Sequence, residues 1–481
     1  MPHPCASMLP PGLFSRSRRN LLLLLALAGF SATTALAHDG HDHPPETPKA
    51  VDETVLYRPT AMPERLLLTW HANPATSQAV TWRTDATVTK AFAEIAVATV
   101  GPTFTATAKT VPAKTGKYAS DLGPVHFHTA KFEDLKPETL YVYRVGDGVN
   151  FSAWCHFRTA SAEPKPFTFV YFGDAQNDLK AHWSRVFREA FSDAPRAMFM
   201  LHAGDLVNRG NREPEWCDWC DAGGWVNATI PTLAVTGNHE YDIDRLGTLP
   251  TDPVEVKKMP RSFTKSWRHR FEFPDNGPVE MADHLRETVY YVDVQGVRII
   301  GLNSMEDPKA QAVWLESVLS KNPNRWTIIS HHHPVYSATL GRDNPEVRHA
   351  WQPLYDKYRV DLVLQGHDHA YLRSELRSHE NIPTGATARS PAGTMYVVSV
   401  SGPKLYDKGI SAGVRRGSRM QLYQVITVDG DELKYQSKTA TGELYDAFTL
   451  KKQMGEVNQL IEQVPNTPEY VTEPEAEKKA P

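Results

Sequence analysis

Polar side chains that can bind metal ions follow five short, strand-like apolar runs of the sequence. In α/β sheets the loops at the carboxyl ends of the strands converge, and ligands bind there. An isolated His or Asp after a strand is usually a cap or a core residue, whereas five such clusters indicate a shared site. The clusters are Asp174, Asp205, Asn238-His239, His331-His332-His333 and His367-Asp368-His369.

Carboxylate, amide and imidazole groups in this combination can bind metal ions, and imidazole suits zinc or iron. An imidazole can also deliver a proton near neutral pH, where carboxylates are usually ionised.

Two regions of the chain differ in their pattern of apolar residues. From residue 165 to 450, β-rich runs alternate with amphipathic helices near 178–192, 309–320 and 346–358, which predicts an α/β domain. From 63 to 160, short alternating strands separated by turns predict an all-β sandwich. In that stretch a Pro turn precedes Tyr141, which is typical of a tyrosine corner, and the stretch resembles a fibronectin type III domain.

The order of the polar motifs carries a further resemblance. Gly-Asp, Gly-Asp-Leu, Gly-Asn-His-Glu, His-x-Pro and Gly-His-x-His follow one another as in the calcineurin-like metallophosphoesterases. The preceding sandwich narrows this to the purple acid phosphatase-like branch, and the resemblance covers about residues 63–450. It implies a four-layer α/β sandwich as the C-terminal catalytic domain.

The resemblance also implies a role for each motif. Asp205 is expected to bridge the two metal ions and His239 to contact the phosphate or to protonate the leaving group. The first metal ion would be bound by Asp174 and His369 as well. The second would be bound by Asn238, His332 and His367, where His332 is chosen because it stands two residues before Pro334. His331 and His333 are then expected to point elsewhere.

Two positions depart from the family pattern. Asn208 stands where purple acid phosphatases have the tyrosine that binds ferric iron and gives the colour, so ferric iron and a purple colour by that route are not expected. Gln176 stands where the wider superfamily often has a histidine ligand. Both are tentative ligands, and with fewer anionic ligands the two ions are expected to be manganese, zinc or ferrous iron.

The loop after the His-x-Pro motif lacks the extra pocket histidines of the family. It offers Arg342 and Asn344 instead, and a guanidinium group can grip a phosphate with two hydrogen bonds. An ordinary Arg–Asp pair in a surface loop remains an equal alternative.

The N-terminal segment predicts that the protein is exported. Arginines before an apolar run and Ala35-Leu36-Ala37 predict a signal peptide over residues 1–37, of either the twin-arginine or the plain secretory type. A bacterial periplasmic or extracellular location follows. Residues 38–62 predict a His- and Pro-rich leader, and 451–481 a disordered tail. The three cysteines beyond residue 37 cannot all pair within the chain, and those at 217 and 220 share a predicted helix.

These features together predict a phosphatase for small phosphorylated substrates. Of the 481 residues 22% are charged, with a net charge of −4, which gives no indication of nucleic-acid binding. After signal cleavage no membrane segment is expected, and the oligomeric state stays open. We expect hydrolysis of phosphate monoesters. The alternatives are a phosphodiesterase or nucleotidase with the same metal ions, or a metal-dependent binding protein without catalysis.

Overall fold

The computed structural model describes residues 50–378, 393–406, 409–453 and 457–471. The predicted signal peptide lies outside these residues, as does the leader up to residue 49. Among the described residues no helix combines the length and the apolar character needed to cross a bilayer.

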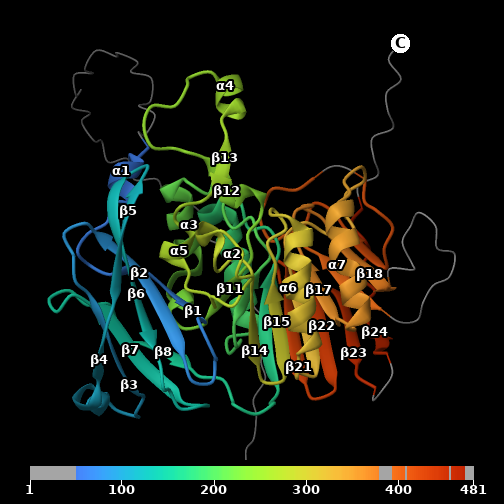
Figure 1. The fold of residues 1–481 in the computed structure, drawn as a ribbon, viewed down its shortest axis with the longest axis horizontal. Coiled ribbons are helices and arrows are strands. Elements are labelled where there is room, and N and C mark those ends of the chain that lie inside the picture. Colours follow the sequence, from blue (N-terminus) through green and yellow to red (C-terminus); the bar gives the residue numbers. More distant parts are fainter. Residues whose placement is uncertain (1–49, 379–392, 407–408, 454–456, 472–481) are drawn as a thin grey trace, which may run out of the picture. The chain divides into compact units, whose positions relative to one another are not determined.

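Two large β-sheets form the core of the chain from Val51 onward (Figure 1). The first has eleven strands in the order β24-β23-β22-β21-β9-β10-β11-β1-β2-β6-β5. In chain order these are β1 (Glu64–Thr69), β2 (Gln78–Asp85), β5 (Lys114–Ser120), β6 (Gly123–Phe132), β9 (Phe167–Phe172), β10 (Met200–His202), β11 (Thr232–Ala234), β21 (Leu422–Asp429), β22 (Glu432–Thr439), β23 (Leu444–Lys451) and β24 (Gln459–Glu462).

The second large sheet has seven strands in the order β14-β15-β16-β17-β19-β18-β20. They are β14 (Tyr290–Val294), β15 (Val297–Gly301), β16 (Trp326–Ser330), β17 (Leu362–Gln365), β18 (Tyr371–Arg377), β19 (Thr394–Val398) and β20 (Arg415–Gly417). Alternate residues of β15, β16 and β17 face opposite sides. Ile299, Ile328 and Leu362 pack into the core shared with the first sheet, whereas Ile300 and Ile329 pack against helices.

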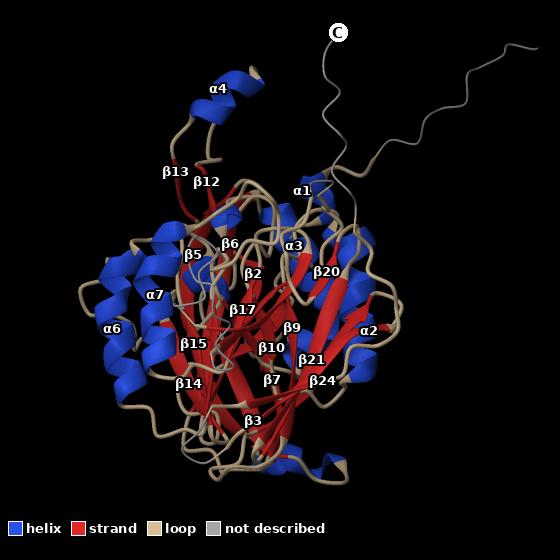
Figure 2. Cartoon of the chain, turned by 90° about the vertical axis from the view of Figure 1, so that its right-hand side faces the viewer, coloured by secondary structure: helices blue, strands red, loops and turns tan. Residues whose placement is uncertain are grey.

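Helices cover the outer faces of both sheets, which confirms the predicted four-layer α/β sandwich (Figure 2). α6 (Pro308–Ser320) and α7 (Pro345–Lys357) cover the second sheet, and α2 (Ser184–Asp193) and α3 (Glu213–Gly223) pack on the first. A ribbon of β12 (Tyr241–Ile243) and β13 (Arg261–Phe263) projects with α4 (Pro253–Lys258) at its tip (Figure 2). The short α5 (Trp267–Arg270) follows it.

The N-terminal β-sandwich is present, but it shares a sheet with the α/β domain. Its outer sheet has the order β4-β3-β7-β8, with β3 (Phe92–Val97), β4 (Lys109–Pro112), β7 (Leu140–Gly146) and β8 (Cys155–Arg158). Its inner sheet is the β1-β2-β6-β5 end of the eleven-stranded sheet, where Thr69 of β1 pairs in parallel with Thr232 of β11. The Tyr141 hydroxyl accepts a hydrogen bond from the Lys136 N–H at 2.8 Å, as the tyrosine corner predicts.

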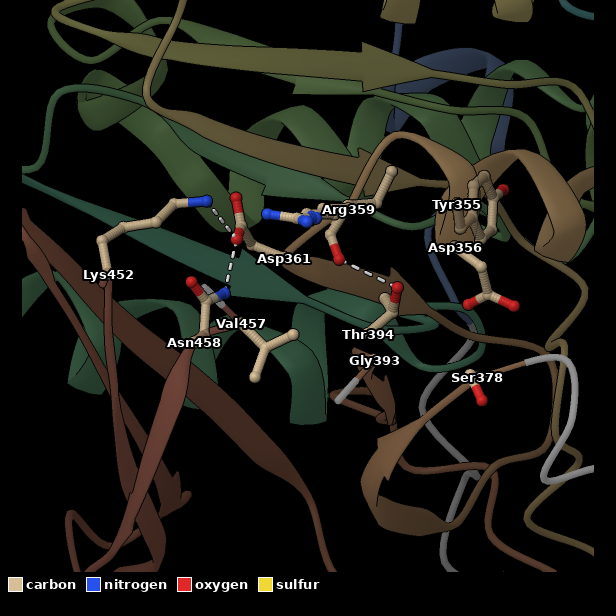
Figure 3. Close-up of a pocket in the computed structure, with 11 residues that line it drawn as sticks. Tyr355, Asp356, Arg359, Asp361, Ser378, Gly393, Thr394, Lys452, Val457 and Asn458 are labelled. Carbon is tan, nitrogen blue, oxygen red and sulfur yellow. Dashed lines mark hydrogen bonds and ion pairs between the residues drawn. The ribbon is translucent and has the colours of Figure 1, made fainter. Parts of the chain in front are cut away.

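The segments next to the chain ends are more ordered than their composition suggests. In the predicted leader, Glu53–Leu56 form α1 and the buried Tyr57 donates a hydrogen bond to Asp218 of α3. In the predicted tail, β24 pairs with β23, and Asn458 and Lys452 bind the buried carboxylate of Asp361 (Figure 3). The prediction of disorder therefore does not hold for β24 (459–462), because a compositional bias does not reveal pairing with a sheet edge.

Cys217 and Cys220 lie buried on α3, where a helix is predicted, and both are free thiols, as is Cys155.

Candidate metal centre

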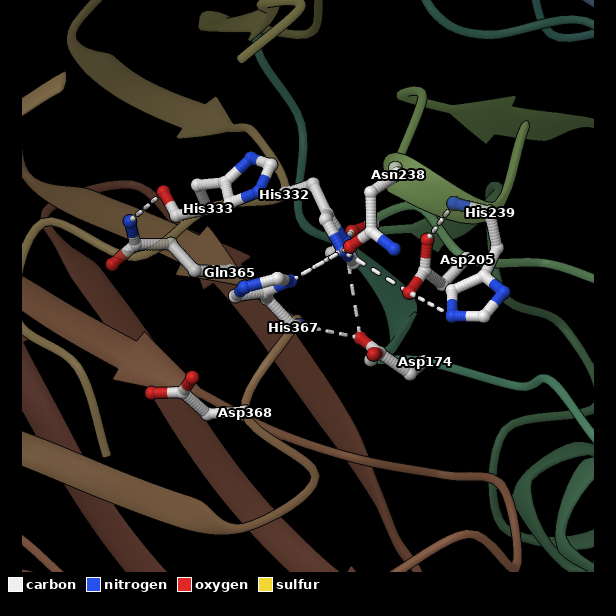
Figure 4. A network of polar contacts seen from close by, with 12 residues as sticks. Asp174, Asp205, Asn238, His239, His332, His333, Gln365, His367 and Asp368 are labelled. Carbon is white, nitrogen blue, oxygen red and sulfur yellow. Dashed lines mark hydrogen bonds and ion pairs between the residues drawn. The ribbon is translucent and has the colours of Figure 1, made fainter. Parts of the chain in front are cut away.

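The polar clusters meet where strands of the two large sheets end (Figure 4). β9, β10 and β11 of the first sheet lead to Asp174, Asp205 and Asn238. β16 and β17 of the second sheet lead to His332 and to the His367–His369 segment. The parallel direction of the strands within each sheet places all of these side chains at one edge.

Two groups of ligand atoms overlap in this cluster. In each group the atoms lie within 4.8 Å of one another: Asp174, Asp205 and His369 in one, and Asp205, His332 and His367 in the other. Asp205 belongs to both. The Asn238 side chain joins the second group, because its Oδ1 lies 2.9 Å from His367 Nδ1 and 3.2 Å from His332 Nε2.

The Asp205 carboxylate has neighbours on both oxygens. Oδ1 accepts the backbone N–H of His239 at 2.8 Å. Oδ2 accepts the Gln176 amide at 3.0 Å and lies 3.2 Å from His332 Nε2. Burial alone would raise the pKa of Asp205, but the neighbouring His332 and His239 hold that pKa below its usual range. The carboxylate therefore stays charged in a buried place.

The donor set fits metal ions. Asp174 is fully buried, and its Oδ2 has no hydrogen-bond partner among the described residues, although it lies 3.1 Å from His369 Nε2. The side-chain oxygen of the buried Gln176 likewise lacks a partner there. Buried polar atoms are normally paired, so these two oxygens fit the ligand atoms of a cation site. Carboxylate, amide and imidazole together suit manganese, zinc and iron.

The backbone of this cluster is strained. Asp205, His367 and His369 all have positive φ, at 50°, 75° and 45°, which residues other than glycine seldom adopt. Such conformations cost about 1–3 kcal/mol each and gather at functional sites. Gly366 lets its backbone pass close to Asp174, because a Cβ atom at this position would lie 2.2 Å from the Asp174 carboxylate.

His239 is held at the edge of the cluster by a backbone contact. Its Nδ1 donates to the Asn208 carbonyl oxygen at 2.6 Å, so Nε2 is the nitrogen left to meet a substrate. Nε2 lies 3.9 Å from Asp205 Oδ2, and the side chain is 19% exposed. Burial lowers the pKa of His239. The imidazole is thus oriented, partly accessible and next to the shared carboxylate.

The two tentative ligands differ in their placement. The Gln176 amide nitrogen lies 3.0 Å from Asp205 Oδ2 and 2.9 Å from His369 Nε2, so this side chain is within the first group. Asn208 contacts the site through its backbone carbonyl, which accepts the hydrogen bond from His239 Nδ1. In the described part of the chain its side-chain amide makes no hydrogen bond to either group.

The two predicted phosphate-binding residues also differ. Arg342 lies against the second group: its Nη2 contacts His367 Nε2, and its Nε lies 3.1 Å from Asp368 Oδ1. Arg342 thus does pair with an aspartate, but this is the buried Asp368, whereas the adjacent Asp343 pairs with Arg348 at 2.5 Å.

For Asn344 the structure differs from the prediction. Its amide nitrogen donates to the Pro334 carbonyl at 3.0 Å and lies 3.3 Å from the Ser337 hydroxyl. The side chain therefore holds its loop together, and its donor is not free for a phosphate.

The other two histidines of the His331–His333 run point in different directions. His331 packs on Trp351, with ring centroids 4.9 Å apart, and so points away from the cluster. The His333 ring lies 4.2 Å from that of His367, so His333 borders the second group. Here the expectation that both point elsewhere holds for His331 only.

Comparison with known proteins matches both regions of the chain. Residues 63–159 match the family described as purple acid phosphatase, N-terminal domain, and residues 167–371 match calcineurin-like phosphoesterase. The chain belongs to the calcineurin-like metallophosphoesterases, in their purple acid phosphatase-like branch.

Two plant relatives and one solved structure illustrate the similarity to this branch. Probable purple acid phosphatase 20 of Arabidopsis thaliana is 28% identical over 249 residues, which are 50% of this chain and 53% of that protein. Fe(3+)-Zn(2+) purple acid phosphatase 12 of the same plant is 25% identical over 52% of each chain. A purple acid phosphatase from yellow lupin seeds has the same fold, with a TM-score of 0.66 at 19% identity, over 81% of this chain and 74% of the lupin chain. The chain thus spans about half the length of the curated relatives it matches.

Two residues of this metallophosphoesterase site were not found from the sequence. The Lys404 ammonium lies 3.4 Å from His239 Nε2, and the Tyr406 ring stacks on His369 with centroids 4.7 Å apart. Both follow β19, whose end lies at the same edge as the others. A Ser-Gly-Pro turn at 401–403 was the available signal. It was missed because no histidine or carboxylate follows it directly.

Glu240 was also missed as a supporting residue. Its buried carboxylate accepts backbone N–H groups of Asp205, Leu206 and Gly237 at 2.7–2.9 Å. Burial raises the pKa of Glu240 to about 8, and the charge of Asp205 adds to that. The carboxyl group holds the turns before both Asp205 and Asn238, which explains why the Gly-Asn-His-Glu motif ends in an acid.

Proposed function

We propose that this protein hydrolyses phosphate monoesters at a centre of two metal ions. The observation that carries the proposal is the sharing of Asp205 by two ligand groups that lie next to His239. A carboxylate between two cations and an oriented imidazole at their edge are what phosphoester hydrolysis needs.

The residues divide into two ligand sets. Asp174, His369 and Asp205 would bind one ion, with Gln176 beside them. Asp205, Asn238, His332 and His367 would bind the other. When bound, the ions supply charge stabilisation of the phosphoryl group and an activated water.

The other side chains act on the ester itself. His239 presents Nε2 toward the cluster, because Nδ1 is committed to the Asn208 carbonyl. In its imidazolium form, His239 can give the Nε2 proton to the leaving oxygen and become the neutral imidazole. Arg342, fixed by Asp368, offers guanidinium N–H groups to the phosphate oxygens. In this assignment the chain binds the ester, orients it and supplies the proton.

The surroundings disfavour a nucleotidase for polyphosphates. A cavity of about 420 Å³ is lined by His333 and by the carboxylates of Glu306, Asp307, Glu346 and Asp343, of which Asp343 is paired with Arg348. A leaving group that enters it meets negative charge, which repels further phosphates. Esters with a neutral or cationic leaving group therefore fit better than nucleoside polyphosphates.

The first test is metal-dependent turnover. Protein of residues 38–481 would be stripped of metal, reloaded separately with manganese, zinc and iron, and assayed on 4-nitrophenyl phosphate. Turnover should return with metal and fall at least about a thousandfold in Asp205→Asn, because both ligand sets lose their common anion. Asp429→Asn, at an exposed aspartate, is the matched control. Folded protein without turnover on this ester under any metal would contradict the proposal.

Export is a separate part of the proposal. It is supported by the arginines, the apolar run and Ala35-Leu36-Ala37 near the start of the sequence. Mass spectrometry of protein recovered outside the bacterial cytoplasm should find His38 as the first residue. Recovery of uncleaved protein from the cytoplasm alone would contradict it.

A further inference from the structure

The segment Ser401–Tyr406 crosses the edge of the metal centre and is fixed to it at two places. The Ser401 and Gly402 N–H groups donate to the Asp174 carbonyl oxygen at 3.0 and 2.6 Å. Further along, His369 Nδ1 donates to the Lys404 carbonyl oxygen. The backbone that carries Lys404 is thus attached to two residues of the first ligand group.

The Lys404 side chain reaches from this segment toward the phosphate side of the site. Its ammonium lies 3.4 Å from His239 Nε2. No carboxylate within the described residues forms an ion pair with it, although Lys404 is half-buried. A half-buried ammonium with no ion-pair partner among the described residues, next to a candidate phosphate site, can pair with an anionic ligand.

A second cation contacts the same segment. Arg342 donates from Nη1 to the Tyr406 hydroxyl at 3.0 Å, and the Tyr406 ring stacks on His369. Lys404 and Arg342 are therefore connected through one short, anchored segment, and each contacts a different histidine of the site, His239 and His367.

We propose that Lys404 binds a non-bridging oxygen of the ester phosphate beside His239 and, with Arg342, makes the site selective for doubly charged monoesters. This rests on the proposed function. A phosphate monoester carries two negative charges above neutral pH, whereas a diester carries one and has a bulky group in place of one free oxygen. A fixed ammonium therefore stabilises the monoester more.

The test compares Lys404→Gln with Lys404→Arg in the metal-loaded protein. kcat/KM would be measured on 4-nitrophenyl phosphate and on bis(4-nitrophenyl) phosphate at pH 8. Lys404→Gln should lower the monoester value by about tenfold to a hundredfold, the range of a lost charge-assisted hydrogen bond, and the diester value by less than about threefold. Lys404→Arg keeps the charge and should recover most of the loss. Lys109→Gln, on the exposed strand β4, is the matched control and should change neither value.

Equal losses on both esters, or no loss on the monoester, would overturn the proposal. Titration calorimetry with inorganic phosphate provides a second readout that does not need turnover. The metal-loaded Lys404→Gln variant should bind phosphate at least about tenfold more weakly than the unaltered protein. If the unaltered protein hydrolyses neither ester, the proposed function fails, while a Lys404-dependent phosphate affinity would still support this anion site. Unchanged phosphate affinity would refute it.

Discussion

Replacement of His239 by asparagine tests the proposed proton transfer most directly. The substitution removes the imidazole whose Nδ1 is fixed by the Asn208 carbonyl at 2.6 Å and whose Nε2 faces the cluster. Asp205 keeps its hydrogen bond from the backbone N–H of residue 239, because that bond does not involve the side chain. The ligand groups should therefore persist, and only the oriented imidazole is lost.

The size of the effect should depend on the leaving group. A positioned general acid contributes about 10²–10⁴ in rate, which corresponds to about 3–5 kcal/mol of activation free energy. An alkyl or phenyl phosphate needs the proton, because its leaving oxygen is strongly basic. 2,4-Dinitrophenyl phosphate leaves as a stable anion, so here the loss should stay below about tenfold.

The assay is therefore a series of monoesters with leaving groups of decreasing basicity. kcat would be measured for the unaltered protein, for His239→Asn and for His284→Asn, which replaces an exposed histidine. Metal content would be measured in each sample. An equal loss on phenyl and dinitrophenyl phosphate, with metal content unchanged, would refute a role in proton transfer and leave only phosphate binding.

Two further predictions concern stability. Glu213 lies buried between Arg83 of the sandwich and Arg270 of α5, so Glu213→Gln should lower the free energy of unfolding by about 3 kcal/mol, measured in urea. Glu316→Gln, in an exposed ion pair, is its control, and an equal midpoint for the two variants would contradict this prediction. Burial and a nearby carboxylate raise the pKa of Glu287 from 4.5 to about 7. The folded protein therefore loses stability as the pH rises from about 4.5 to about 7, because ionisation of this group is harder in the folded state. Glu287→Gln should leave the melting temperature nearly unchanged at pH 5 and raise it at pH 8. The corresponding gain in the free energy of unfolding at pH 8 is up to about 3 kcal/mol. An equal shift at both pH values would contradict it.

The sequence predicts the fold and the clustering of the polar residues well, for a physical reason. Strands buried on both faces read as continuous apolar runs, and a change from such a run to Gly-Asp or Gly-His marks a strand end. Gly366 illustrates this, because the space beside Asp174 leaves no room for a Cβ atom. The motifs therefore identify residues such as Asp174, whose close neighbours must be glycine.

Contacts that depend on loop paths could not be predicted in the same way. Lys404 and Tyr406 reach the site because Ser401 and Gly402 bind the Asp174 carbonyl, and no residue type is needed for a backbone hydrogen bond. Asn344 illustrates the opposite case. A polar residue near an arginine expected to bind phosphate suggested a ligand, yet the Pro334 carbonyl accepts the hydrogen bond from its amide.

The relation between the sandwich and the metal centre follows from a single strand pairing. β1 of the sandwich lies beside β11, and the chain after β11 carries Asn238 and His239. Arg83, in the neighbouring strand β2, reaches Glu213 of α3, while Glu215 on the same helix accepts the backbone N–H of Asn208. The Asn208 carbonyl in turn orients His239. Since each of these contacts is a hydrogen bond or ion pair of a buried or half-buried group, the sandwich is part of the support that holds the proposed proton donor.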